Sequence, residues 1–439
     1  MKNLLIVFAA LALALSCSRD KDPHAVWTYD SVVYEMNVRQ YTPEGTLAAA
    51  RNELPRLKEL GVDIVWLMPI YEIGVKARKG SLGSYYAIRD YTSVNHEFGT
   101  LEDFDSFVRE AHRLGLKVVL DWVANHTSPD CPWVDEKPAD WYVRDSLGNT
   151  IVEYDWTDIA KLNYDNARMR EAVVDAMRFW LDRDIDGFRC DMAYIVPRDF
   201  WETAIPKLRS EYAPKGLYFL AEGEEPWLHE AGFDATYAWK VHHLLNDIAR
   251  GKAGVKELKE YVAEDAARFP GDAFRLMFTS NHDENSWAGS EFKRMGDAAH
   301  LMSVLTFTLP QSQPLVYTAQ EIGYDHEFAF FEKDSVTDWT DNAHTAFYTS
   351  LIRLRHSHPA LRPGEKGGDY AFVDEPWVPE NVFAFTRTYA GDTLLVLANL
   401  SGQDIFCTVP DAHLLKDAFT GEPSENQSLA PWGWQVLTK

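Results

Sequence analysis

Three acidic residues, Asp191, Glu222 and Asp283, each end a short β-like run and are separated by 31 and 61 residues. These separations are about one and two times the length of a strand plus its return helix in a (β/α)8 barrel, which takes about 250 residues for eight such units. Carboxylates at the carboxyl ends of barrel strands converge on one mouth, where enzymes with this fold carry out their chemistry. The spacing therefore predicts an acid-base site built from three carboxylates.

Eight strand candidates would position these residues. They span residues 32–37, 63–68, 117–121, 186–191, 217–222, 233–238, 275–281 and 314–318. Each of them but the last precedes a helical pattern, and several are continuous apolar runs, as parallel strands buried on both faces should be. Alternating strands and helices predict a parallel sheet, and eight units predict an α/β fold of the (β/α)8 or TIM-barrel type.

The regular interval breaks in one place and ends in another. Between Asp121 and Asp191 about 40 residues exceed one unit, which predicts a small inserted domain after the third strand, residues 126–166. A smaller excess at 69–85 predicts a long loop on the same rim. The barrel itself should comprise 25–125 and 167–358. Beyond residue 359 the pattern alternates with a period of two, which predicts a C-terminal antiparallel β domain over 359–439.

The first 17 residues predict a targeting signal. Residues 4–15 are apolar, too short to span a bilayer and typical of a signal peptide. The run before Cys17 is similar to a bacterial lipoprotein cleavage site, so we expect export to the periplasm or cell surface with a lipid on Cys17; ordinary secretory cleavage is the alternative. The other cysteines, Cys131, Cys190 and Cys407, are far apart and odd in number, so they predict no disulfide framework.

The composition limits the partners. The chain has 439 residues, 46% of them hydrophobic, and a net charge of −24. Nucleic acids and anionic lipids would be repelled by such a charge, so a neutral substrate fits best. No other apolar segment is long enough to span a membrane. We therefore expect membrane attachment only through an N-terminal lipid. We expect a monomer.

Four short segments, each containing an acidic residue, form a recognisable set of sequence motifs. They are Asp121-Trp122-Val123-Ala124-Asn125-His126, Gly187-Phe188-Arg189-Cys190-Asp191, Phe219-Leu220-Ala221-Glu222 and Phe278-Thr279-Ser280-Asn281-His282-Asp283. In order and spacing they resemble the short signatures of the α-amylase family of retaining glycoside hydrolases. The segment from Ser84 to Tyr91 also looks like that family's sequence after the second strand. The resemblance covers about residues 30–435.

Retaining cleavage of a glycosidic bond needs one carboxylate nucleophile and one carboxylic acid, about 5–5.5 Å apart. We expect Asp191 to be the nucleophile, with its pKa lowered by neighbouring Arg189. Glu222 follows an apolar strand, where desolvation would raise its pKa, so we expect it to be the acid. Glu224 is a close competitor but lies farther out on the loop. The resemblance implies that Asp283 is a third carboxylate that binds sugar hydroxyls.

The resemblance also implies substrate contacts. His126 and His282 match two histidines that hydrogen-bond the sugar, and Tyr86 matches an aromatic platform beneath it. Arg189 completes the predicted substrate-binding set. The tryptophans of the insertion are either sugar contacts or packing residues.

A metal is less strongly implied. Asn125 matches a calcium ligand of many members, and oxygen ligands suit calcium. However, Tyr194-Ile195 replaces the Lys-His that often completes that site. The catalytic mechanism requires no cofactor.

The resulting hypothesis is an α-glucan hydrolase that cleaves α-1,4 bonds in starch-derived glucans or malto-oligosaccharides by double displacement. Three alternatives stay open: an α-glucan transglycosylase, an α-1,6-acting hydrolase of the oligo-1,6-glucosidase or pullulanase type, and a non-catalytic glucan-binding relative. The intact set of three carboxylates argues against the last. Linkage preference depends on rim loops, whose shape the sequence motifs do not specify.

Overall fold

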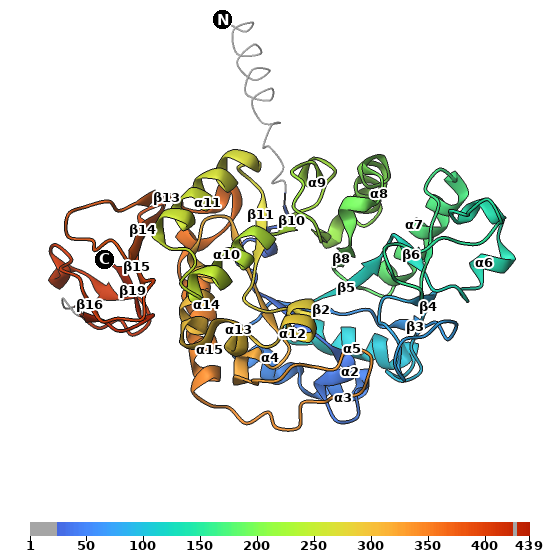
Figure 1. Cartoon of the computed structure of the whole chain (residues 1–439), viewed down its shortest axis with the longest axis horizontal. Helices are drawn as coiled ribbons and strands as arrows, with labels where there is room; N and C mark the ends of the chain where they lie inside the picture. The colour runs from blue at the N-terminus through green and yellow to red at the C-terminus, as the bar shows by residue number, and fades with distance from the viewer. Residues whose placement is uncertain (1–23, 425–427) are drawn as a thin grey trace, which may run out of the picture.

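The computed structural model describes residues 24–424 and 428–439. The predicted leader and Cys17 lie outside the described residues. A closed barrel occupies the centre of the molecule, with the C-terminal domain at one end of the long axis and the insertion at the other (Figure 1). Within the described ranges, no helix is both long and apolar enough to cross a membrane.

Eight parallel strands form the barrel, and their order confirms the predicted fold class. They are β1 (Val33–Met36), β2 (Ile64–Leu67), β5 (Lys117–Val123), β8 (Gly187–Asp191), β9 (Tyr218–Ala221), β10 (Ala235–Tyr237), β11 (Phe274–Met277) and β12 (Ser312–Tyr317). Each strand pairs with the next one along the chain, and β12 closes on β1. All eight of the expected strands are therefore present, with ends that differ by a few residues.

The side chains of the strands alternate between two cores, as a period of two requires. In β2, Ile64 and Trp66 belong to the cluster that fills the barrel, whereas Val65 and Leu67 pack outward beneath the helices. The inward set continues toward the carboxyl ends of the strands. There, polar residues replace apolar ones, so the barrel interior opens into a charged mouth.

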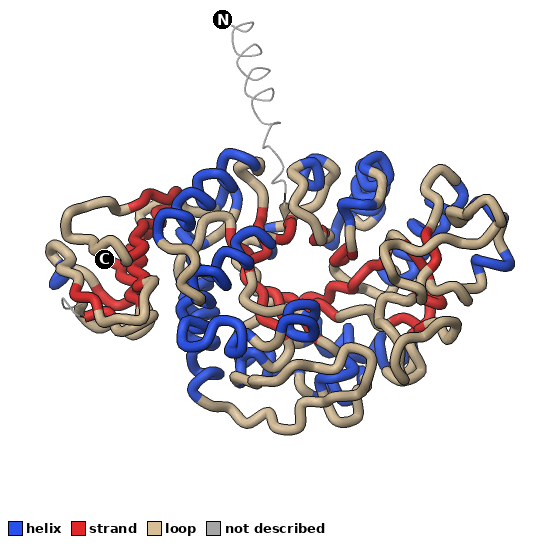
Figure 2. Tube along the Cα trace, in the orientation of Figure 1, coloured by secondary structure: helices blue, strands red, loops and turns tan. Residues whose placement is uncertain are grey.

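Helices surround the barrel (Figure 2). They are α2 (Val38–Tyr41), α3 (Leu47–Asn52), α4 (Leu54–Leu60), α5 (Leu101–Arg113), α7 (Ala167–Leu181), α8 (Arg198–Glu211), α9 (Trp227–Glu230), α10 (Trp239–Ala249), α11 (Val255–Arg268), α12 (His282–Ala288), α13 (Glu291–Met295), α14 (Ala299–Thr308) and α15 (Ala343–Ser357). Helix α5 illustrates how the sequence determines where a helix begins and which face it buries. Thr100 and Asp103 form a capping box at its start, which satisfies two backbone N–H groups. Its buried face follows helical spacing through Phe104, Phe107, Val108 and Ala111.

The rim carries two short sheets. The insertion contains α6 (Trp133–Glu136) and an antiparallel pair of β6 (His126–Thr127) and β7 (Ala160–Lys161). After β2, where the sequence predicts only a loop, the chain forms a second antiparallel pair of β3 (Tyr71–Ile73) and β4 (Ile88–Val94). Tyr71 and Ile73 bury their side chains while Glu72 between them does not, so this strand is too short for its alternation to be recognised in the sequence.

The C-terminal domain is an antiparallel sheet in the order β13-β14-β15-β19-β17. Its strands are β13 (Asp369–Phe372), β14 (Val382–Tyr389), β15 (Asp392–Asn399), β17 (Lys416–Asp417) and β19 (Trp434–Thr438), with β16 (Ile405–Phe406) and β18 (Ser428–Leu429) in a second small sheet. Ala390 and Gly391 make the two-residue turn between β14 and β15, both with positive φ, as a type I′ hairpin turn requires. Buried Arg387 ties this sheet to the end of α14 by donating to the carbonyls of Thr308 and Leu309 at 3.0 and 2.9 Å.

Candidate active site

A cavity of about 740 Å³ lies over the carboxyl ends of the barrel strands. Its lining includes the three predicted carboxylates together with the histidines and the tyrosine that the sequence singled out: Tyr86, His126, Asp191, Glu222, His282 and Asp283. Residues more than 190 positions apart in the chain thus share one wall. Arg189 and Asn125 lie just behind this wall and are buried.

Arg189 is the centre of the charge network. Its side chain is 0% exposed. Nη1 lies 3.2 Å from Asp191 Oδ1 and 2.9 Å from Asp121 Oδ1, and Nη2 lies 2.9 Å from Glu222 Oε2. The strand register makes this possible, because Asp121 and Arg189 are partners across β5 and β8 and point to the barrel interior. One guanidinium therefore holds Asp191 and Glu222 at its two amino ends.

The environment of Asp191 differs from the sequence-based expectation. Burial and the nearby charge of Glu222 raise the pKa of Asp191 well above its usual range, although Arg189 opposes this. Arg189 acts on the pKa of Asp191 in the expected direction, but the expectation of a net lowering was wrong. Arg189 is shared with Asp121 and Glu222, so its single charge does not outweigh the desolvation of Asp191 and the repulsion among the acids.

Glu222 continues the inward side of β9, since Tyr218 and Leu220 on the same face fill the barrel. Its Oε2 accepts a hydrogen bond from the backbone N–H of Met192 at 2.8 Å, in addition to its contact with Arg189. Its surroundings are thus polar on one side, not the apolar pocket that the strand sequence suggested. Glu224 points elsewhere: it pairs with Arg275 at 3.0 Å and does not line the cavity.

His282 and Asp283 start α12. His282 Nδ1 lies 2.5 Å from Glu35 Oε1, and Nε2 lies 2.7 Å from the Tyr86 hydroxyl and 3.3 Å from Asp283 Oδ2. Although burial opposes the charged form, the carboxylates of Asp283 and Glu35 raise the pKa of His282 to about 9. Burial raises the pKa of Asp283, and the positive charge of His282 opposes this. His282 is therefore held as an imidazolium between two acids.

Two buried acids of this network, Glu35 and Asp121, are absent from the predicted site. Both point into the barrel, and neither lines the cavity. Asp121 accepts from Trp66 Nε1 and from the Tyr86 hydroxyl, each at 3.2 Å. Each acid lies at the carboxyl end of a strand, so the rule that selects Asp191 could have found them as well.

His126 faces the cavity from the start of the insertion. Asn125 Nδ2 lies 3.2 Å from its Nδ1, and among the described residues no hydrogen bond satisfies its buried Nε2. Burial lowers the pKa of His126 to about 4, against a smaller opposing effect of the Tyr86 backbone. With Asn125 donating to Nδ1, the neutral ring carries its hydrogen on Nε2. This side chain therefore offers a hydrogen-bond donor to a ligand.

The surroundings of Asn125 bear on its predicted role as a calcium ligand. Its side chain contacts His126, and its backbone oxygen accepts from Leu162 N at 3.1 Å. Calcium takes six to eight oxygen ligands. In the described part of the chain, the one group of three or more His, Cys, Asp or Glu ligand atoms lies on α10 and α12, not at Asn125. Asn125 thus supplies an amide oxygen without a carboxylate cluster.

Aromatic side chains surround the cavity opening. Tyr154 and Trp156 come from the insertion, Trp287 comes from α12, and Phe330 and Phe331 come from the loop after β12. Trp287 is 61% exposed. By contrast, Trp133 and Trp141 pack against each other inside the insertion, with ring centroids 5.2 Å apart. The sequence alone did not distinguish the tryptophans that face the cavity from those that pack inside the insertion.

Comparisons with known proteins agree with this geometry. The family model described as the alpha amylase catalytic domain matches residues 19–344. The chain is 28% identical to the alpha-amylase MalA of Haloarcula japonica over 409 residues, which cover 90% of this chain and 59% of that protein, so it spans less than two thirds of that relative's length. It is 25% identical over 428 residues to the probable oligo-1,6-glucosidase 3 of Bacillus subtilis, covering 80% of this chain and 75% of that protein. Among solved structures, it is similar to an alpha-amylase from Lactobacillus plantarum, with a TM-score of 0.84, 30% identity, and coverage of 94% of this chain and 100% of that one.

Proposed function

Because the chain belongs to the α-amylase family of glycoside hydrolases, we propose that it cleaves α-1,4-glucosidic bonds in starch-derived glucans or malto-oligosaccharides with retention of configuration. One observation carries the proposal: Asp191 and Glu222 bind the two amino ends of the same buried guanidinium in the wall of a glucan-sized cavity. Retaining cleavage needs two carboxyl groups held close together, and a shared guanidinium provides such an arrangement.

In the first step, a carboxylate oxygen of Asp191 attacks the anomeric carbon and forms a glycosyl ester. Protonated Glu222 gives its hydrogen to the departing glycosidic oxygen, so that a neutral alcohol leaves. The two protonation states support each other. When Glu222 carries the proton, its charge no longer raises the pKa of Asp191, and Arg189 then favours the ionised nucleophile.

In the second step, Glu222 takes a proton from water as the water attacks the ester, which restores both carboxyl groups. The transition states carry positive charge on the sugar ring. Asp283, partly exposed to the cavity, is positioned to accept from sugar hydroxyls and to stabilise that charge.

Three further residues would hold the sugar in the reacting position. Tyr86 presents its ring to the cavity and has its hydroxyl fixed by His282 and Asp121. His126 would donate to a sugar hydroxyl through Nε2, and His282 would do so by sharing the Nε2–H that also contacts Tyr86 and Asp283. Arg189 would act by orienting Asp191 and Glu222 and not by touching the sugar, which changes its predicted role.

We retain two parts of the sequence-based hypothesis as proposals. Members of this family often bind calcium, and Asn125 is the residue we propose as a ligand if the insertion does so; chelator treatment followed by thermal unfolding tests this. Export with lipid attachment at Cys17 rests on the leader sequence alone. Radiolabelled palmitate incorporation, abolished by Cys17→Ala, tests it.

Product analysis tests the activity. Purified protein incubated with maltoheptaose should release short malto-oligosaccharides, initially as α-anomers by proton NMR. Asp191→Asn and Glu222→Gln should each lower kcat by at least about a thousandfold without loss of the circular dichroism signal. Glu224→Gln is the matched control, because it removes a neighbouring carboxylate outside the cavity. Near-normal rates in either of the first two variants would refute the assignment.

The same assay separates the alternatives. Pullulan and an isomalto-oligosaccharide test α-1,6 cleavage, which the similarity to a probable oligo-1,6-glucosidase makes a relevant comparison. Products longer than maltoheptaose at high substrate concentration would reveal a transglycosylase, in which a sugar replaces water in the second step. No product from any of these substrates would favour a binding protein.

A further inference from the structure

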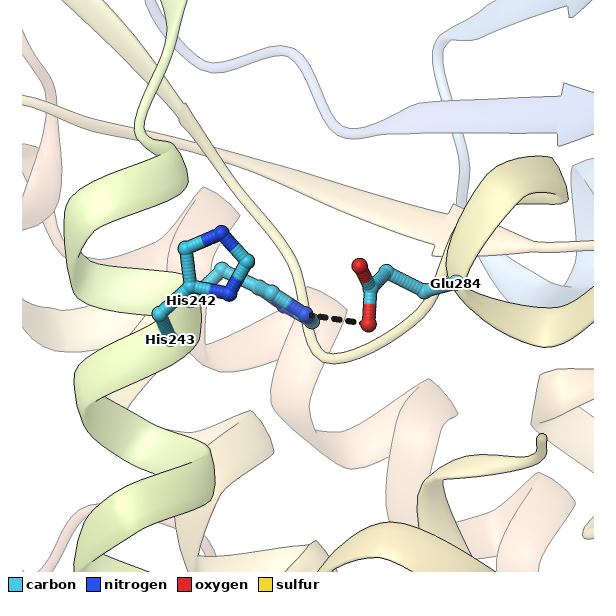
Figure 3. A group of neighbouring side chains, drawn as sticks. All are labelled: His242, His243 and Glu284. Carbon is cyan, nitrogen blue, oxygen red and sulfur yellow. Dashed lines mark ion pairs between the residues drawn. The ribbon is translucent and has the colours of Figure 1, made fainter. Parts of the chain in front are cut away.

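A second cluster of ligand-type side chains lies behind the cavity. His242 and His243 are neighbours on α10, and Glu284 lies on the first turn of α12 (Figure 3). One side-chain nitrogen of each histidine and one carboxylate oxygen all lie within 4.8 Å of one another. His242 is buried, Glu284 is half-buried and His243 is exposed, so the cluster extends from the interior to the surface.

The hydrogen bonds of His242 fix where its lone pair points. Nδ1 lies 3.1 Å from the carbonyl oxygen of Phe278, which can only accept, so Nδ1 carries a hydrogen. Nε2 lies 3.2 Å from Asn246 Nδ2 and 3.0 Å from Glu284 Oε2. The amide of Asn246 is oriented by Arg294, whose Nη1 donates to Oδ1 at 3.0 Å, and this leaves Nδ2 as the atom facing His242.

These contacts conflict in either state of the ring. If His242 is neutral, the Nε2 lone pair faces an ionised oxygen of Glu284 at 3.0 Å, and two acceptors oppose each other. If Nε2 carries a hydrogen, it can donate to Glu284 but then lies against the N–H group of Asn246, so that two donors are close together. A cation between Nε2 and Glu284 removes the first conflict. Asn246 then keeps its other hydrogen bond, to the His242 carbonyl at 2.9 Å.

We propose that His242, His243 and Glu284 form a binding site for a divalent transition-metal ion of the Zn²⁺ class. Two imidazoles and one carboxylate suit zinc, and three protein ligands leave a position for water. The Nδ1–H of His242 bonded to a backbone carbonyl is the supporting contact that metal-binding histidines usually have.

The geometry needs one adjustment. Two ligand atoms of a tetrahedral zinc ion lie about 3.3 Å apart. The separation of His242 from Glu284 is close to this value, whereas the 4.8 Å limit of the cluster is larger, so the third ligand must move inward. His243 can do so, since in the described part of the chain its ring makes no hydrogen bond; it stacks on Trp239 and meets His242 edge-on, with centroids 5.9 and 5.4 Å apart.

The ion would join α10 to α12. Glu284 directly follows Asp283, and α12 also carries His282 and Trp287, so a metal at this site would fix the segment that supplies three residues of the cavity. The proposal stands independently of the enzymatic function. Its test measures binding, not turnover.

Isothermal titration of the chelator-treated protein with zinc sulfate tests the site. We expect one ion per chain and a rise in the midpoint of thermal unfolding on saturation. His243→Ala and Glu284→Gln should each weaken zinc binding at least tenfold. His243→Ala is the decisive variant, because the exposed ring can be removed without disturbing the core.

His96→Ala provides the matched control. His96 is an exposed histidine paired with a glutamate, Glu72, at 3.0 Å, as His242 is paired with Glu284, but within residues 24–424 and 428–439 no third ligand-type side chain joins this pair. Its removal should leave the zinc affinity within twofold of the original. No binding by the unaltered protein, or equal affinity with and without His243, would overturn the proposal.

Discussion

Replacing Glu35 by Gln should lower the pKa of His282. The substitution keeps the size of the side chain and a carbonyl oxygen to accept from His282 Nδ1, but it removes the negative charge 2.5 Å away. Glu35 is fully buried and does not line the cavity, so the change acts on the sugar only through His282. Glu35 is in this sense a positioning residue.

The size of the effect follows from the pKa of His282. The difference between 6.5 and about 9 corresponds to about 3 kcal/mol in favour of the imidazolium. Because the pKa is raised in the folded protein, this stabilisation is complete below about pH 6.5 and is lost as the pH rises through about 9. Loss of one carboxylate at contact distance lowers such a pKa by about 1–3, while Asp283 remains to hold it above that of a free histidine.

Nitrogen NMR of protein labelled at histidine measures this directly, with His282→Gln to assign the resonance. The unaltered protein should titrate at about 9, and Glu35→Gln clearly lower. The fall in unfolding free energy between about pH 6.5 and 9 should shrink in the same variant. Glu291→Gln, which also removes a buried carboxylate but one that does not act on His282, should leave the titration of His282 unchanged. A His282 that titrates near 6.5, or that is unaffected by Glu35→Gln, would refute the reasoning.

Two further outcomes are expected. Because burial and Glu222 raise the pKa of Asp191 and the reaction needs it ionised, kcat/KM should fall with decreasing pH well above the ordinary aspartate value of 3.8; an undiminished rate at about pH 4 would contradict this. Trp156→Ala should raise the KM for maltoheptaose roughly twofold to tenfold, the equivalent of about 0.5–1.5 kcal/mol, while Trp133→Ala lowers the melting temperature but leaves KM unchanged.

The barrel and the cavity wall could be predicted because strand-end residues repeat at a fixed interval. Asp191, Glu222 and Asp283 converge for this reason, and the choice of Glu222 over Glu224 follows from which residue leaves the strand first. The same rule applied to every strand would have added Glu35 and Asp121. Both acids point inward by the same alternation as Asp191.

Electrostatics and the rim could not be predicted in this way. Arg189 is two residues from Asp191 in the sequence, which suggested that it pairs with Asp191 alone. In the folded protein it forms ion pairs with three acids, Asp121, Asp191 and Glu222. Burial and repulsion then outweigh it, and neither is visible in a linear sequence. Phe330 and Phe331 likewise reach the cavity from a loop with no periodic pattern, so only the fold places them there.

The charge network has a consequence for which sugars can enter. It combines five carboxyl groups with two basic ones: Glu35, Asp121, Asp191, Glu222 and Asp283 against Arg189 and His282. Lys79, the basic side chain on the cavity rim, is paired with Asp158 at 3.3 Å. Phosphorylated or uronic sugars would meet an excess of negative charge, with no unpaired lysine or arginine among the described lining residues to receive them, whereas amino sugars would be attracted. The mouth of the barrel thus discriminates among sugars by ionic charge before any hydroxyl group is recognised.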